Sequence, residues 1–224
     1  PALSFSSTTP HTPILSGLVG SEMCIRDSHY RKLISERKSD LEVIDKLPKS
    51  MDIEIGILRS LAKSNDQKTA IREIPLQMRR FYIHAYQSYI FNKTLSMAFE
   101  YEEDLFIPKE NDVCYDRTGK LGKFQNETGQ RLTIPLVGHS YFKKTRFDYY
   151  IQKILEQEEI SPSSFFIKDF QEISIDGGFR NASVRCDGFQ ASDNMIEFQL
   201  SRGSYATIVI REILKPNEPL SSGF

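Results

Sequence analysis

Three polar side chains recur along one apolar segment at the spacing of a single helical face. Arg80, His84 and Gln87 occupy positions i, i+4 and i+7, so a helix would project them to the same side. A cation, an imidazole and an amide beside aromatic residues could contact a phosphate or the edge of a nucleic-acid base. A buried hydrogen-bond network that fixes the helix would use the same side chains. The sequence leaves both interpretations open.

A second candidate group interleaves basic and aromatic residues. Lys143, Lys144 and Arg146 stand within the stretch YFKKTRFDYY, residues 141–150. Cations beside stackable rings are typical of proteins that bind unpaired RNA. A solvated turn that opens an amphipathic helix has the same pattern, and we favour that interpretation. Exposed aromatic rings would reverse the preference.

Composition restricts the classes of function. Lys and Arg number 29 against 30 Asp and Glu, so the chain has no global positive field, and net charge neither supports nor excludes an RNA partner. Cys24, Cys114 and Cys186 are odd in number and far apart, which favours a reduced, metal-free, cytosolic protein. No apolar run approaches the roughly 18 residues of a membrane helix.

The first 28 residues differ from the rest of the chain. They are rich in Ser, Thr and Pro and show no helical or strand periodicity. The stretch GLVGSEMCIRDS resembles translated sequencing-adapter sequence, so residues 1–28 are set aside from the fold as a non-native or disordered head. Natural sequence is then expected to begin near His29.

Helices are expected through the first half of the chain. The apolar spacing predicts them over Tyr30–Lys46, Asp52–Ala62 and Lys68–Ile74, followed by a long one over Leu76–Phe99. The long helix should be largely buried, because its apolar residues cover more than one face. One expected buried stripe consists of Met78, Phe81, Tyr82, Ala85 and Tyr89.

Strands and turns are expected in the second half. Short β-prone runs broken by Gly and Pro occupy residues 105–138, and a helix is predicted over Tyr149–Ile160. Further strands are predicted over the segments Phe165–Phe170, Arg180–Cys186, Met195–Leu200 and Tyr205–Ile213. The expected fold class is α+β with a mainly antiparallel sheet.

Three blocks of sequence carry a family resemblance. The first is Arg79-Arg80 with HAYQSYIFN at residues 84–92, and the second is DGGFR at residues 176–180. The third is FQLSRGSYATIVIREILK at residues 198–215. In this order and separation they resemble the TruD family of tRNA pseudouridine synthases, in its archaeal and eukaryotic form, over roughly residues 50–216. The resemblance implies part of a pseudouridine synthase fold together with the family's inserted TRUD domain.

The resemblance also implies a reaction and a partner. Such enzymes isomerise a uridine of tRNA, usually at position 13, in the cytoplasm and without a cofactor or metal. Flipping the base, breaking its glycosidic bond and rejoining it through C5 require a carboxylate, an aromatic platform and basic groups. The family's G-x-K-D-x-x-A-x-T-x-Q and N-Y-F-G-x-Q-R-F-G motifs do not occur in this sequence. Both belong upstream of residue 29 in family order, so we expect a truncated, inactive fragment without its catalytic aspartate.

Domain limits follow from the resemblance. The helical part of the insertion is assigned to residues 29–75, a core helix to 76–100 and the inserted α/β domain to 101–180. The final strands of the catalytic domain are assigned to 181–216, with a tail over 217–224.

The three blocks contribute further candidate residues. Arg180, Tyr205 and Arg211 are expected to support the active site or bind RNA. Arg211, on the expected last strand, could grip a phosphate or orient the missing aspartate. A structural salt bridge is the alternative for Arg211, and both stay open. Lys168-Asp169 lacks the rest of the catalytic motif and is interpreted as a strand-edge ion pair.

A second class of function competes with the isomerase. A non-catalytic RNA-binding or protein-interaction module could use the same basic and aromatic surface, and the presence or absence of the aspartate separates the two. Salt-dependent tRNA binding would support either RNA interpretation. Unpaired sheet edges and open apolar faces lead us to expect aggregation or a partly molten lobe when the chain is expressed alone.

Overall fold

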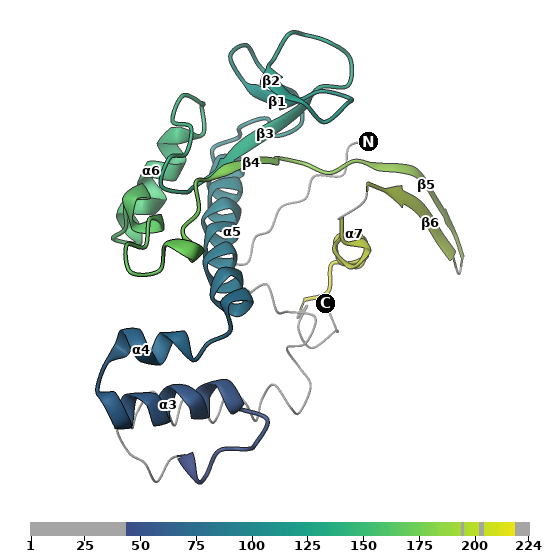
Figure 1. The fold of residues 1–224 in the computed structure, drawn as a ribbon. Helices are drawn as coiled ribbons and strands as arrows, with labels where there is room; N and C mark the ends of the chain where they lie inside the picture. The colour runs from purple at the N-terminus through teal and green to yellow at the C-terminus, as the bar shows by residue number, and fades with distance from the viewer. Residues whose placement is uncertain (1–43, 194, 202–203, 218–224) are drawn as a thin grey trace.

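The computed structural model describes residues 44–193, 195–201 and 204–217 (Figure 1). The head over residues 1–28, and nearly all of the expected helix over Tyr30–Lys46, lie outside the described residues. The same holds for the tail beyond residue 217.

Two short helices open the described fold. Helix α3 spans Asp52–Ser64 and ends at Asn65, whose φ of 50° is left-handed. The Asp66 side chain then accepts hydrogen bonds from the backbone N–H groups of Lys68 and Thr69, which caps helix α4, Gln67–Arg72. Both predicted helices are confirmed. A small apolar cluster beneath α3 contains Ile44, Leu47, Met51 and Leu58.

Helix α5, Leu76–Glu100, runs through the centre of the molecule (Figure 1). Its predicted existence is confirmed, but the expectation that it is largely buried is wrong for its first half. Phe81 is 38% exposed and Tyr82 48% exposed. The sheet and helix α6 pack against the later turns, so the buried positions come late. They are Gln87, Ile90, Phe91, Thr94 and Ala98.

A four-stranded sheet packs on the C-terminal half of α5. Its strands are β1 (Val113–Tyr115), β2 (Leu121–Lys123), β3 (Arg131–Leu136) and β4 (Gly178–Asn181), in the order β2-β1-β3-β4. All neighbours are antiparallel. The strand β3 is central and buries Leu132 and Ile134 in the same core as Phe91 and Phe147. The α+β class with an antiparallel sheet is confirmed.

Helix α6, Asp148–Gln157, covers another side of α5 and confirms the predicted helix. Ile151 and Ile154 are fully buried there beside Ile90 of α5. The strand predicted over Phe165–Phe170 is wrong, because that segment is the irregular link between two 3-10 turns. The turns are η1, Pro162–Phe165, and η2, Gln171–Ile173. Local bonds hold the link, as from Phe166 N–H to the Ser163 carbonyl at 3.0 Å and from Phe170 N–H to the Ile167 carbonyl at 2.9 Å.

The last elements form an arm that consists of β5, β6 and α7. Strands β5 (Cys186–Ser192) and β6 (Met195–Leu200) make an antiparallel hairpin, and β6 confirms its prediction. The strand predicted over Arg180–Cys186 is only partly right. Its first residues lie in β4 and its last begins β5, and residues 182–185 between them are irregular.

The segment predicted as the strand Tyr205–Ile213 is helix α7, Ala206–Leu214, so that prediction is wrong. An apolar run of this length suits either element. No strand among the described residues pairs with this segment, and a helix satisfies the backbone hydrogen bonds within the segment itself. Only Val209 of α7 is buried.

The arm stands apart from α5 and the sheet (Figure 1). Neither β5 nor β6 contributes a residue to the apolar core clusters of the described chain. Several of its large apolar side chains are exposed: Phe189, Met195, Ile196, Ile208 and Leu214.

Candidate functional site

Arg180 is positioned by a close approach of two backbone segments. Gly177 has a φ of 105°, and a Cβ there would lie 2.7 Å from the Leu136 carbonyl oxygen. A Cβ on Gly138 would lie 2.1 Å from the Gly177 nitrogen. Only glycines tolerate this contact, which sets the register of β4 on β3 so that Arg180 pairs with Ile134.

The Arg180 side chain crosses from the sheet to helix α5. Its guanidinium carbon lies 5.1 Å from the centre of the Phe91 ring. Both terminal nitrogens lie 3.4 Å from the Ser88 hydroxyl oxygen, to which they donate. Among the described residues no carboxylate pairs with this guanidinium, so it retains donors for an anionic group.

Desolvation by the surrounding protein lowers the pKa of Arg180, and an electrostatic effect of Tyr205 acts in the opposite direction. The Tyr205 side chain is 74% exposed. Arg180 and Ser88 come from separate sequence blocks, and the fold joins them by hydrogen bonds.

The polar stripe on α5 divides between structural and exposed residues. Gln87 is buried and donates to the Val137 carbonyl at 2.9 Å, so it fixes the helix to the end of β3. Arg80 donates through Nε to the Glu172 carbonyl at 2.9 Å. His84 is exposed and lies four residues before Ser88, so the two residues share one face of α5.

Arg211 lies on helix α7 rather than on the predicted strand. Its Nη2 stands 3.8 Å from Oε1 of the adjacent Glu212, and both side chains are mostly buried. The predicted strand is therefore absent, and a role for Arg211 in supporting the active site or binding RNA stays a prediction.

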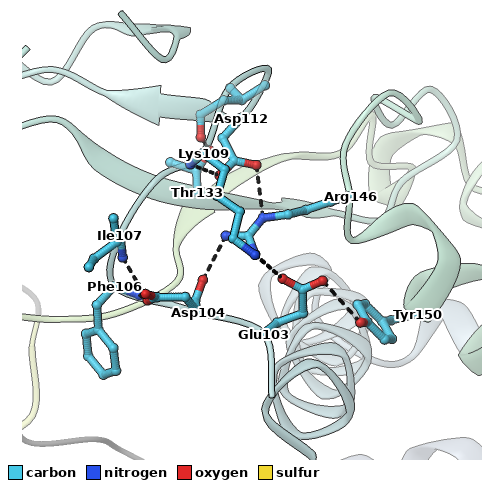
Figure 2. A network of polar contacts seen from close by, with 10 residues as sticks. Glu103, Asp104, Phe106, Ile107, Lys109, Asp112, Thr133, Arg146 and Tyr150 are labelled. Carbon is cyan, nitrogen blue, oxygen red and sulfur yellow. Dashed lines mark hydrogen bonds and ion pairs between the residues drawn. The ribbon is translucent and has the colours of Figure 1, made fainter. Parts of the chain in front are cut away.

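Arg146 is the centre of a structural network (Figure 2). It donates to Glu103, to Asp112 Oδ1 at 3.1 Å and to the Asp104 carbonyl at 2.7 Å. Burial opposes ionisation of Glu103, but the hydrogen bond from Lys109 and the charge of Arg146 outweigh it and lower the pKa of that carboxyl. With its donors engaged in this way, Arg146 joins the end of α5 to the start of α6.

Lys143 and Lys144 are exposed, unlike Arg146. The neighbouring Phe142 is 40% exposed and Tyr149 is 59% exposed, which is the condition under which the sequence favours RNA contact. A role for these two lysines in RNA binding stays a prediction.

Lys168-Asp169 is not a strand-edge pair. Asp169 Oδ2 pairs instead with Lys68 Nζ of α4 at 2.9 Å, and both side chains are more than half exposed. The pair links α4 to the turn before η2.

The remaining chemistry-bearing groups point to no further centre. Burial raises the pKa of the Cys114 thiol to about 11, which leaves it protonated at neutral pH. The described part of the chain has no cluster of three or more His, Cys, Asp or Glu side chains placed to hold a metal ion. No helix within those same residues is long and apolar enough to cross a membrane.

Sequence reasoning missed Ser88 and Phe91. Both lie in the stretch HAYQSYIFN, but the partner that reveals their role is distant in the sequence. The i, i+4 spacing from His84 to Ser88 was the one available signal, since it puts them on one face.

Comparison with known proteins identifies the family. The family model of tRNA pseudouridine synthase D (TruD) matches residues 18–213, a range that starts within the head set aside above. A probable tRNA pseudouridine synthase D of Pyrobaculum islandicum is 32% identical over 181 residues, which cover 79% of this chain and 43% of that protein. The corresponding protein of Methanopyrus kandleri is 33% identical over 180 residues, 77% of this chain and 42% of its own.

A solved structure supports the fold. The crystal structure of a putative tRNA pseudouridine synthase D from Methanosarcina mazei aligns with a TM-score of 0.72 and 23% identity, over 92% of this chain and 59% of that one. The chain spans about half the length of the curated relatives that it matches. The chain belongs to the tRNA pseudouridine synthase D (TruD) family, whose model matches it over residues 18–213.

Proposed function

We propose that this chain supplies the inserted domain and the C-terminal part of the catalytic domain of a cytoplasmic tRNA pseudouridine synthase. The proposed substrate is a uridine of tRNA, at position 13. A further segment, carrying the catalytic aspartate, completes the enzyme, and the chain without it is inactive.

One observation carries the proposal. Ser88 and Arg180 come from two of the three sequence blocks that resemble the family, and they are hydrogen-bonded although they lie 92 residues apart in the chain. A guanidinium that lacks a carboxylate partner among the described residues suits recognition of an anion.

The proposed chemistry needs no cofactor. The N1–C1′ bond of uridine breaks, the uracil turns, and a C5–C1′ bond forms, while C5 loses a proton and N1 gains one. The aspartate acts near C1′. Arg180 donates to an RNA phosphate beside the flipped base, which holds the nucleotide while its base is detached.

The test begins with the intact gene. The coding sequence upstream of the His29 codon is recovered from the source DNA, and the complete protein is incubated with unmodified tRNA. Pseudouridine is then mapped by carbodiimide modification and reverse-transcription stops. We expect a stop at position 13 that disappears when the aspartate of the recovered G-x-K-D motif is changed to asparagine.

Arg180 is examined in the same complete protein. Arg180→Ala should lower the isomerisation rate by at least tenfold, about 1.4 kcal/mol in the barrier, and Arg180→Lys should recover part of it. The matched control is Arg59→Ala on helix α3, an exposed arginine away from β4, which should leave the rate unchanged.

A complete gene without the aspartate motif, together with salt-dependent tRNA binding and no pseudouridine, would replace the isomerase with a non-catalytic RNA-binding module.

A further inference from the structure

A groove lies between the four-stranded sheet and the start of the arm. Its lining residues are 106–107, 117 and 128–132 on the side of the sheet and 183–187 with 189 at the start of the arm. Its volume of about 1180 Å³ exceeds the roughly 300–1,000 Å³ typical of small-molecule pockets. The groove therefore has room for a ligand larger than a typical small molecule.

The groove is lined by more positive than negative charge. Arg117, Arg131 and Arg185 contribute three cations, and Asp187 is the single carboxylate among the lining residues. Neither Arg131 nor Arg185 makes an ion pair with a residue in the described ranges. A polyanion would complement this surface.

The third arginine is fixed along the groove wall. Arg117 donates through Nε to the Thr128 carbonyl at 2.8 Å. It lies across Gly129, where a Cβ would stand 2.5 Å from Arg117 Nε and where φ is 92°. The glycine thus makes room for the guanidinium, whose terminal nitrogens stay available for donation.

Two aromatic rings in the lining add a second kind of contact. Phe106 is 38% exposed, and Phe189 on β5 is 42% exposed. Exposed rings interleaved with cations are suited to unpaired nucleotides, whose bases stack on the rings while the cations hold the phosphates.

We infer that this groove binds an unpaired segment of the substrate RNA, with Arg117, Arg131 and Arg185 on its phosphates and Phe106 and Phe189 on its bases. The inference rests on the proposed function for the identity of the ligand as RNA. It concerns surfaces other than the Arg180 site, and gives the sheet and the arm a shared binding role.

The first experiment removes the charges. Binding of a fluorescent 12-nucleotide oligouridine to the full chain is measured by anisotropy across a salt series. Arg131→Gln and Arg185→Gln should each weaken binding and lower the slope of log K against log salt by about one. Arg131→Lys should retain the slope, and Arg59→Gln on α3 should leave affinity and slope unchanged.

The second experiment removes a ring. Phe189→Ala should weaken oligouridine binding by about fivefold or more, with little change in the salt slope. The matched control is Met195→Ala, which removes an apolar side chain that is 64% exposed on the neighbouring strand β6. Far-UV circular dichroism and thermal unfolding of each variant exclude a loss of fold as the cause.

Equal losses in Arg59→Gln and the groove variants would overturn the inference in favour of diffuse charge attraction. Preference for an RNA duplex over the oligouridine would also overturn it. A complete protein that no longer binds the oligouridine would overturn it as well.

Groove-dependent binding without pseudouridine formation would refute only the proposed function. Pseudouridine formation that is indifferent to the groove variants would refute only the groove.

Discussion

Arg146 shows that basic residues within one sequence pattern can have different roles in the fold. The stretch YFKKTRFDYY gives it the same apparent role as Lys143 and Lys144. In the fold it is mostly buried against Glu103 and Asp112 (Figure 2), and the lysines stay exposed. Local sequence could not distinguish them, because the acidic partners lie more than 30 residues away.

Replacing Arg146 therefore tests stability rather than binding. Arg146→Leu leaves Asp112, whose side chain is 4% exposed, and Glu103 without their main cation. We expect a loss of about 3 kcal/mol in the free energy of unfolding, the low end for a broken buried pair because Lys109 remains nearby. Urea denaturation measures it. Lys144→Leu is the control and should change stability by less than about 0.5 kcal/mol.

The sequence identified which residues are active-site candidates, but it did not predict how they are arranged in space. Arg180 was named through the resemblance, but its hydrogen bonds to Ser88 depend on the Gly138–Gly177 contact and on the packing of the sheet against α5. Neither feature follows from spacing along the chain.

One carboxylate at the end of α6 binds three side chains of α5, in addition to the apolar packing between the two helices. Glu158 follows α6 and accepts from three side chains of α5: Lys93 Nζ at 2.7 Å, Tyr89 Oη at 3.0 Å and Tyr86 Oη at 3.2 Å. The hydrogen bond from Lys93 is the main reason that the pKa of Glu158 is lowered from its ordinary value of 4.5.

This fastening makes stability depend on acid. A carboxyl with a lowered pKa in the fold stabilises it above its unfolded value near 4.5, and that contribution is lost as the pH falls through the folded pKa. Glu158→Gln should therefore be less stable than the native chain at pH 7 and should decline less steeply between about pH 5 and 3. Glu156→Gln, an exposed position on α6, should follow the native profile. Identical profiles for the native chain and Glu158→Gln would contradict this account.

Some elements were predictable from the sequence and others were not. The length of the Leu76–Phe99 run, which contains no Gly or Pro, and the alternation over Met195–Leu200 gave α5 and β6. The β-branched residues of the run Tyr205–Ile213 favoured a strand, but the segment forms a helix. The buried half of α5 was likewise set by where β3 and α6 pack, which a helical wheel does not contain.

At the scale of the whole molecule, the described residues divide into a well-packed centre and an exposed arm. Leu132, Ile134, Ile151 and Ile154 are at most 2% exposed. In the arm, Met195 is 64% exposed.

Hydrogen exchange should report this division directly. Amides of β3 and α6 should exchange slowly, and those of β5 and β6 should exchange far faster, because few apolar contacts oppose their opening. In the complete protein the hairpin should become protected. Equal protection of β3 and β5 in this chain by itself would show that the arm needs no further partner, and would remove the reason to expect aggregation.

Helix α5 has a mechanical consequence. Its 25 residues form a rod about 37 Å long, tied by Arg80 to Glu172 near one end and by Gln87 to Val137 near its middle. We therefore expect the helix and the elements bonded to it to move together as one body. A rotation of about 5° about one end moves the other by about 3 Å, so pivots in the irregular residues 73–75 and 182–185 would open or close the molecule around a bound strand without bending any helix.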